Sequence, residues 1–210
     1  MKTEDLIAVL SADILPRKAV AQQLARALPV ATLISIAAFM VFWGPRPDIW
    51  AALGSMAALK TLLPLGFVLL AAALALSLAH PGTRHDTQSA ALGVFVILVI
   101  GTFGSALLKA GFAGLSAALS TPSLVTCLLS IPVLALPVFI AVFWALASGA
   151  ALRPRLTGAV AGALAGGLAA AIYSIYCDKD MILFVVPAYS AAILSISALG
   201  ALLGPRLLKW

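Results

Sequence analysis

Six long apolar segments account for most of this chain, and they constrain its fold more than any other feature. Each has about the 20 residues that an α-helix needs to cross a bilayer core roughly 30 Å thick. The 210 residues are 63% hydrophobic and only 10% charged, which is far more apolar than one soluble core requires. We therefore predict an all-α, polytopic membrane protein, a six-transmembrane-helix bundle with spans at residues 27–43, 61–79, 89–108, 125–146, 156–176 and 181–203.

The basic residues indicate how this bundle is oriented. An even number of spans places both termini on one side, and the more basic side of a membrane protein faces the cytoplasm. Of the 13 lysines and arginines, nine fall on the side of the termini: Lys2, Arg17, Lys18, Arg26, Arg84, Arg153, Arg155, Arg206 and Lys209. The other four are Arg46, Lys60, Lys109 and Lys179. We therefore expect cytoplasmic N- and C-termini.

Two domains follow from this division. Residues 1–26 form a cytoplasmic N-terminal segment, which we do not interpret as a signal peptide, because no small-residue cleavage site follows an apolar run. Residues 27–210 form the transmembrane domain. Within it, Lys60 interrupts a long apolar stretch. A lysine at mid-bilayer costs at least about 2.5–3.5 kcal/mol, so we expect Lys60 to snorkel to the interface.

The chain has two cysteines, Cys127 and Cys177. The predicted orientation places both at the extracytoplasmic ends of adjacent spans, where disulfides are permitted in bacteria. Their pairing requires a Cα separation below about 7 Å. Three interpretations stay open: a structural disulfide, two inert small residues, or a sensing pair. The sequence has no Cys-x-x-Cys motif, which argues against a thiol oxidoreductase.

Glycines recur every four residues in two predicted spans. Such G-x-x-x-G patterns let helix backbones approach closely, and we expect them to pack inside the bundle, with a homodimer face as the alternative. The glycines concerned are Gly158, Gly162, Gly166, Gly200 and Gly204. Pro132, Pro137 and Pro187 are expected to kink their helices.

The predicted spans contain almost no acidic, arginine or histidine side chain. Ion-coupled transporters commonly hold such groups at mid-membrane, so their absence argues against that class. His80 and His85 lie in a short loop that we interpret as a polar turn and not a metal site. No nucleophile–base pair or phosphate loop is present, so we predict no enzyme, no cofactor and no metal.

The N-terminal segment carries a short amphipathic pattern. Thr3 can cap a helix that ends before Pro16, with its apolar residues on one face. This helix either lies on the membrane or docks into a groove on a cytoplasmic partner. The candidate contact residues are Glu4, Asp5, Leu6, Ile7, Leu10 and Asp13, flanked by Arg153 and Arg155 of an inner loop.

Four stretches together resemble one known family. They are MKTEDLIAVLSAD at the start, ALRPRLTGAVAGALAGG, the Tyr-x-x-Tyr-Cys at 173–177, and the ending GALLGPRLLKW. The chain is similar in these to the NrsF family of polytopic anti-sigma factors. The resemblance implies a negative regulator that binds an extracytoplasmic-function sigma factor at the inner membrane until stress is sensed. The family's two cysteines map onto Cys127 and Cys177.

The functional prediction is therefore an anti-sigma factor of the bacterial inner membrane. In it, Cys127 and Cys177 sense oxidative or metal stress, and the cytoplasmic face binds the sigma factor without direct nucleic-acid contact. A homo-oligomer is possible. The alternatives are a small facilitator or transporter, for which Ser174, Ser190, Ser195 and Ser197 are the candidate polar lining, and a thiol–disulfide membrane protein. We expect these serines to bond back to their own helices.

Overall fold

The computed structural model describes residues 20–80 and 84–208. Within them it contains six helices long and apolar enough to cross a membrane, and no strand among the described residues. This confirms the prediction of an all-α, six-span membrane protein. The spans are α2 (Val20–Phe42), α4 (Leu59–Leu78), α5 (Asp86–Leu119), α6 (Ser123–Leu146), α7 (Pro154–Tyr173) and α8 (Ile182–Leu207), with the short α3 (Ile49–Leu53) and η1 (Met56–Ala58) between α2 and α4.

The helices differ most from the predicted spans in two places. The first helix runs from Val20, seven residues before the predicted span, and includes the exposed Arg26. The third continues to Leu119, past the expected end at residue 108. It changes direction at Gly111, whose positive φ of 69° only glycine adopts easily. The helices α6 and α8 continue through Pro132, Pro137 and Pro187.

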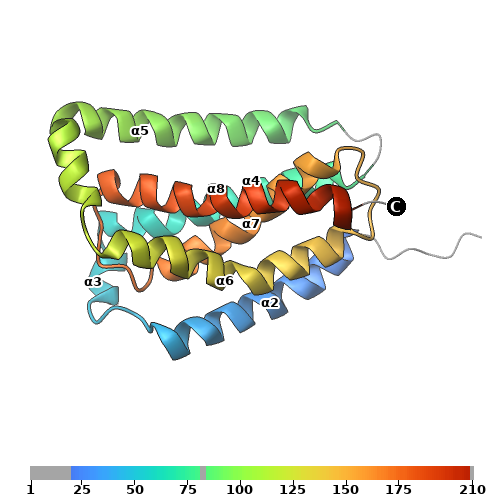
Figure 1. Ribbon diagram of the computed structural model, residues 1–210, viewed down its shortest axis with the longest axis horizontal. Coiled ribbons are helices and arrows are strands. Elements are labelled where there is room, and N and C mark those ends of the chain that lie inside the picture. The colour runs from blue at the N-terminus through green and yellow to red at the C-terminus, as the bar shows by residue number, and fades with distance from the viewer. Residues whose placement is uncertain (1–19, 81–83, 209–210) are drawn as a thin grey trace, which may run out of the picture.

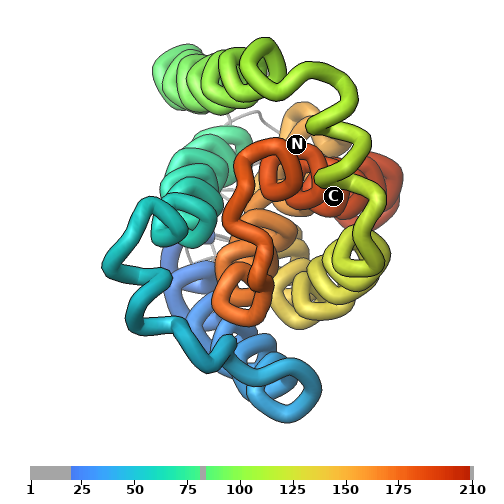
Figure 2. The backbone as a smooth tube through the Cα atoms, turned by 90° about the vertical axis from the view of Figure 1, so that its left-hand side faces the viewer, coloured from blue at the N-terminus to red at the C-terminus, as the bar shows by residue number. Residues whose placement is uncertain are grey.

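Helix α7 is the centre of the bundle. Of its most apolar window, 78% is buried, against 22% to 44% for α2, α4, α6 and α8. Alanines and glycines make up most of its sequence, so neighbouring helices can approach its backbone on several sides. It packs against α8, α4 and α6, and Figure 2 shows these helices arranged around it.

The contact between α7 and α8 is made by glycine. A Cβ atom at Gly158 would overlap the carbonyl oxygen of Gly200, and one at Gly200 would overlap that of Gly158. A Cβ at Gly162 would strike the Ile196 carbonyl, and one at Gly204 the Pro154 carbonyl. Gly166 faces Ile193. The glycine repeats therefore meet each other within a single chain.

Helix α5 lies apart from the rest of the bundle. None of its residues is buried, and it packs mainly against the outer sides of α4 and α8, as Figures 1 and 2 show. One of its few close contacts is between the rings of Phe95 and Phe67, whose centroids are 6.2 Å apart. A lipid-facing side chain costs nothing in a bilayer, so this helix needs no buried face.

The two ends of the bundle hold different residues. At one end Gly149 lies against Val20 and Ala79, and the amide of Ala150 donates to the Ala79 carbonyl at 3.0 Å. The last described residues of α8 lie at this same end (Figure 1). At the other end are α3, η1 and the segment 174–181 that joins α7 to α8. That the first end is cytoplasmic stays a prediction.

Replacing Gly158 by alanine tests the α7–α8 contact. The added methyl group meets backbone, which cannot rotate away, so the two helices must separate, and we expect a loss of about 1–3 kcal/mol of stability. Denaturation of the detergent-solubilised protein would measure it. The control is Gly101→Ala in α5, where nothing lies within 4 Å of a Cβ; equal losses in the two variants would contradict the role of this contact.

Candidate functional site

The two cysteines meet at the end of the bundle that holds α3 and η1. Cys127 lies near the start of α6 and Cys177 lies four residues beyond the end of α7. Both are free thiols, with 0% and 2% of their surface exposed. The Cys127 thiol lies close enough to Cys177 to affect the ionisation of that thiol. Two residues 50 positions apart in the chain are thus neighbours in the fold, and both are shielded from solvent.

Tyrosines surround this thiol pair. The hydroxyl oxygen of Tyr173 lies 3.5 Å from Cys127 Sγ, a hydrogen-bonding distance for sulfur. The Tyr173 ring also packs against Tyr176 and Tyr189, with centroid separations of 5.7 and 6.4 Å. The Tyr-x-x-Tyr-Cys stretch therefore supplies both a thiol and part of the aromatic wall around it.

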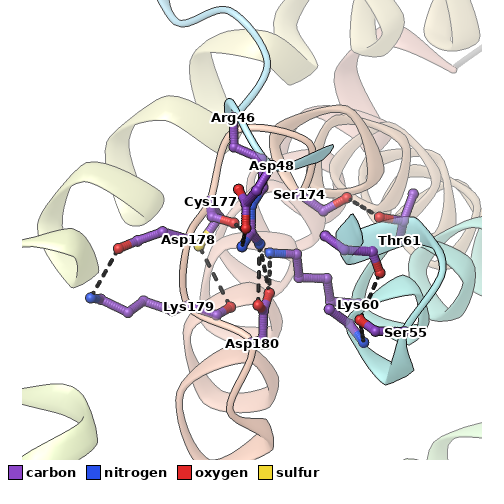
Figure 3. A network of polar contacts seen from close by, with 12 residues as sticks. Arg46, Asp48, Ser55, Lys60, Thr61, Ser174, Cys177, Asp178, Lys179 and Asp180 are labelled. Atoms are coloured by element: carbon purple, nitrogen blue, oxygen red, sulfur yellow. Dashed lines mark hydrogen bonds and ion pairs between the residues drawn. The ribbon is translucent and has the colours of Figure 1, made fainter. Parts of the chain in front are cut away.

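Arg46 holds the segment that carries Cys177. Its amide donates to the Ile175 carbonyl at 3.0 Å, and its guanidinium donates to the carboxylate of Asp180 at 3.0 Å and to the Cys177 carbonyl at 3.4 Å (Figure 3). The same guanidinium forms a two-pronged ion pair with Asp48, at 2.6 Å for each bond. Such paired bonds fix the orientation of an arginine.

Lys60 holds the same segment from α4. Its Nζ lies 2.5 Å from Asp180 Oδ1 and also donates to the Cys177 carbonyl. It lies in the first turn of α4, but it is buried and neutralised by Asp180, whereas the sequence suggests a lysine that reaches toward water. The next residue, Thr61, shares a 2.6 Å hydrogen bond with Ser174 (Figure 3). The cysteine segment is therefore clamped to two other parts of the chain.

This arrangement favours a thiolate at Cys177. The neighbouring Cys127 side chain, opposed by burial and aided by the nearby charge of Lys60, lowers the pKa of Cys177 to about 6. Burial raises the pKa of Asp180, but its bonds to Lys60 and Arg46 outweigh this and leave the pKa below its usual value. At neutral pH Cys177 is therefore largely ionised, which is the form of cysteine that reacts with oxidants and soft metal ions.

The chemistry open to the site follows from its donors. Two adjacent thiols can give up two electrons to form a disulfide, or can bind a soft metal ion. Among the described residues, no three His, Cys, Asp or Glu side chains are grouped to hold a metal ion. Oxidation to a disulfide needs an external oxidant but no further side chain of the protein.

The other predicted residues lie elsewhere or outside the description. Arg153 precedes α7 and Arg155 lies in its first turn, both exposed, at the end of α7 opposite Cys177. The predicted contact residues Glu4, Asp5, Leu6, Ile7, Leu10 and Asp13 lie outside the described residues. The structure does not bring the thiols and the arginines together; α7 connects them.

The four serines that are the candidate polar lining of a transporter do not line one common pathway. Ser174 and Ser195 donate to carbonyls three residues back in their own helices, and Ser197 donates to the Ala159 carbonyl of α7. Ser190, in α8, lines the space between α4, α5 and α8.

The sequence does not predict the clamp. The distribution of charge places Arg46 and Lys60 on the outer side, but it indicates no role for them at the cysteines, because both are more than 100 residues from Asp180 in the chain. The signal available was weak: Lys60 interrupts an apolar run, and Asp180 lies close behind Cys177.

Comparison with known proteins gives two matches. The family described as "NrsF: Negative regulator of sigma F" matches residues 10–210. A protein of Azospira oryzae, named "Probable anti-sigma-F factor NrsF", is 34% identical over the full length of both chains. No solved structure matches this chain.

The clamp is tested by Asp180→Asn. This change leaves Lys60 buried without its counter-ion, so we expect a loss of about 1–3 kcal/mol of stability, with the lower figure favoured because the Asp180 side chain is 36% exposed. The control is Asp178→Asn, which removes only an exposed pair with Lys179 and should cost less than about 1 kcal/mol. Denaturation midpoints in detergent compare the two, and an equal effect would contradict the clamp.

The ionisation of Cys177 is a separate test. Thiolate absorbance near 240 nm, taken as the difference between the chain and its Cys177→Ser variant, should rise with a midpoint near pH 6. In Cys127→Ala the midpoint should move upward, toward about 8.5, because the neighbouring side chain that most stabilises the thiolate is gone. A midpoint that is the same with and without Cys127 would show that the two thiols do not interact.

Proposed function

Because the chain belongs to the NrsF family, whose description is a negative regulator of sigma F, we propose that it is a membrane-bound anti-sigma factor that releases its sigma factor when Cys127 and Cys177 are oxidised. The sigma factor is of the extracytoplasmic-function class, and the membrane is the bacterial inner membrane with both termini in the cytoplasm. The observation that carries the sensing step is the meeting of the chain's two cysteines in one buried, clamped site.

The chemical step is the formation of one disulfide. The sulfur atoms of Cys127 and Cys177 bond, the two electrons that they lose pass to the thiol-oxidising stress compound, and the one proton still held by the Cys127 thiol is released to that compound or to water. Binding of a metal ion by the same two thiols is the second event through which stress is sensed. The thiolate character of Cys177 supports both, since thiolates attack oxidants and bind soft metals.

Helix α7 is the route by which this step reaches the cytoplasmic end. Its 20 residues span about 30 Å, from Cys177 just beyond one end to Arg153 and Arg155 at the other. Its glycine contacts with α8 are backbone to backbone. A displacement of α7 is therefore passed on to α8 and is not taken up by rearrangement of side chains between them. A new bond between α6 and the segment after α7 therefore displaces α7 along or about its axis.

The sigma factor binds at the cytoplasmic face. Leu6, Ile7 and Leu10 form the apolar contact, and Glu4, Asp5 and Asp13 meet basic groups of the partner. Arg153 and Arg155, exposed at the start of α7, complete the surface. The coupling required is small, because a difference of about 1.4 kcal/mol in affinity between the two states changes occupancy tenfold.

Co-purification tests the proposal. The full chain, a version lacking residues 1–15, and the double variant Cys127→Ser with Cys177→Ser are each co-expressed with sigma factors of the same genome and solubilised. We expect the reduced full chain and the double variant to retain a sigma factor, and the truncated version to lose it. Treatment with the thiol oxidant diamide should release the sigma factor from the full chain by about tenfold or more, and not from the double variant.

Two results would overturn the proposal. A folded full chain that retains no sigma factor would refute the anti-sigma function. Equal release from the full chain and from the double variant would leave the anti-sigma function standing and refute sensing by the cysteines. Intact insertion of every variant is checked by its helical circular dichroism.

A further inference from the structure

A cavity of about 340 Å³ lies between α4, α5 and α8. Its wall is almost wholly apolar and includes Pro64, Phe67, Phe95, Val99 and Ile193. A cavity of this size holds a small organic molecule or the head of a larger one. It lies within the membrane-spanning part of the chain, so its occupant must come from the bilayer.

One buried hydroxyl at this cavity has no partner. Tyr189 lines the cavity and is 3% exposed, and its hydroxyl forms no hydrogen bond in the part of the chain that the structure describes. The hydroxyl lies near enough to Cys177 to help lower the pKa of that thiol, but the two do not meet in hydrogen-bond geometry. A buried donor without an acceptor is unfavourable, and a ligand oxygen that accepts its hydrogen bond would remove that cost.

The charge of the cavity limits what it can take. Lys60 is its charged wall residue, but its ammonium is already paired with Asp180 and bonded to the Cys177 carbonyl. No charge is left to hold an anionic head group. The remaining polar groups are the hydroxyls of Tyr189 and Ser190, which suit a neutral ligand with carbonyl oxygens.

Two further features of the cavity wall indicate which class of ligand it can hold. Phe67 and Phe95 face each other at the wall, and their rings suit a flat, unsaturated ligand. The α5 part of the wall is not buried: Val96 is 40% and Ile100 61% exposed. The cavity is thus open between loosely packed helices to molecules dissolved in the lipid.

We propose that this cavity binds a lipid-soluble quinone, and that the bound quinone oxidises Cys127 and Cys177. Tyr189 stands between the cavity and the thiols, and its hydroxyl donates a hydrogen bond to a quinone carbonyl oxygen. The two sulfurs bond to each other, and the quinone accepts two electrons from them, one proton from the Cys127 thiol and a second proton from water to become the hydroquinone. The oxidation part of this proposal rests on the proposed sensing function; the binding part does not.

The test uses the full chain in lipid nanodiscs that contain no quinone, reduced and kept without oxygen. Ubiquinone-1 is added, its binding is measured as the quinone retained with the nanodiscs at equilibrium, its reduction by the loss of quinone absorbance, and the thiols by a maleimide gel shift. We expect saturable binding, reduction of about one quinone per chain, and loss of both thiols together. Tyr189→Phe keeps the ring and should weaken binding about tenfold, the effect of one lost hydrogen bond.

A second pair of variants guards against an indirect effect of Tyr189 on Cys177. Val99→Trp fills the cavity from α5 and should abolish saturable binding. Its matched control is Val133→Trp on α6, at a residue that is 54% exposed and outside the cavity wall, and it should bind quinone as the parent chain does. Empty nanodiscs measure simple partition into lipid.

Retention of quinone no greater than with empty nanodiscs, or equal binding by Val99→Trp and the parent chain, would overturn the proposal and leave acyl chains as the occupants of the cavity. Binding without loss of thiols would refute the oxidation step. Diamide separates these failures from failure of the proposed function. If it forms the disulfide and releases the sigma factor while quinone does neither, the sensor stands without the quinone; if it forms the disulfide with no release, the sensor itself fails.

Discussion

The backbone contact between α7 and α8 is the interaction on which the rest of this structure depends. Lipid tails are as apolar as leucine, so helices in a bilayer gain little by hiding ordinary apolar side chains from lipid. They gain more where their backbones approach closely and many atoms touch at once. Gly158, Gly162, Gly200 and Gly204 allow that approach, and the other helices then pack around a central pair whose position is already fixed.

The polar end of the bundle uses a different physical effect. Lys60 and Arg46 both meet Asp180, and together they tie α4 and the loop after α2 to the segment that carries Cys177. Low surrounding polarity strengthens these bonds and makes each of them costly to break. The charge of Lys60 also stabilises the Cys177 thiolate. One cluster therefore both positions the cysteine and sets its reactivity, which is economical in a chain with so few charged residues.

The sequence was sufficient for the fold class because the number of apolar segments and the thickness of a bilayer leave few alternatives. The break of α5 at Gly111 could not be predicted, because a glycine in an apolar segment is equally typical of a helix contact and of a helix break. The clamp was also out of reach. Positive-inside counting treats Arg46 and Lys60 as interchangeable outer charges, whereas their partners come from a loop more than 100 residues later. Because their spans are adjacent, Cys127 and Cys177 were reasonably expected to lie near each other. Their direct contact and the position of Tyr189 beside them could be learned only from the structure.

Helix α5 gives the protein an unusual relation to its membrane. It is 34 residues long and breaks at Gly111, whereas about 20 residues suffice to cross the hydrocarbon core. It buries no side chain against its neighbours, so it exchanges protein contacts for acyl-chain contacts at little cost. A thicker or thinner bilayer is therefore accommodated by the tilt of α5 and by how much of its second half lies in the interface, while the glycine-packed centre stays unchanged. Hydrophobic mismatch is thus absorbed by one helix, and the five others are relieved of it.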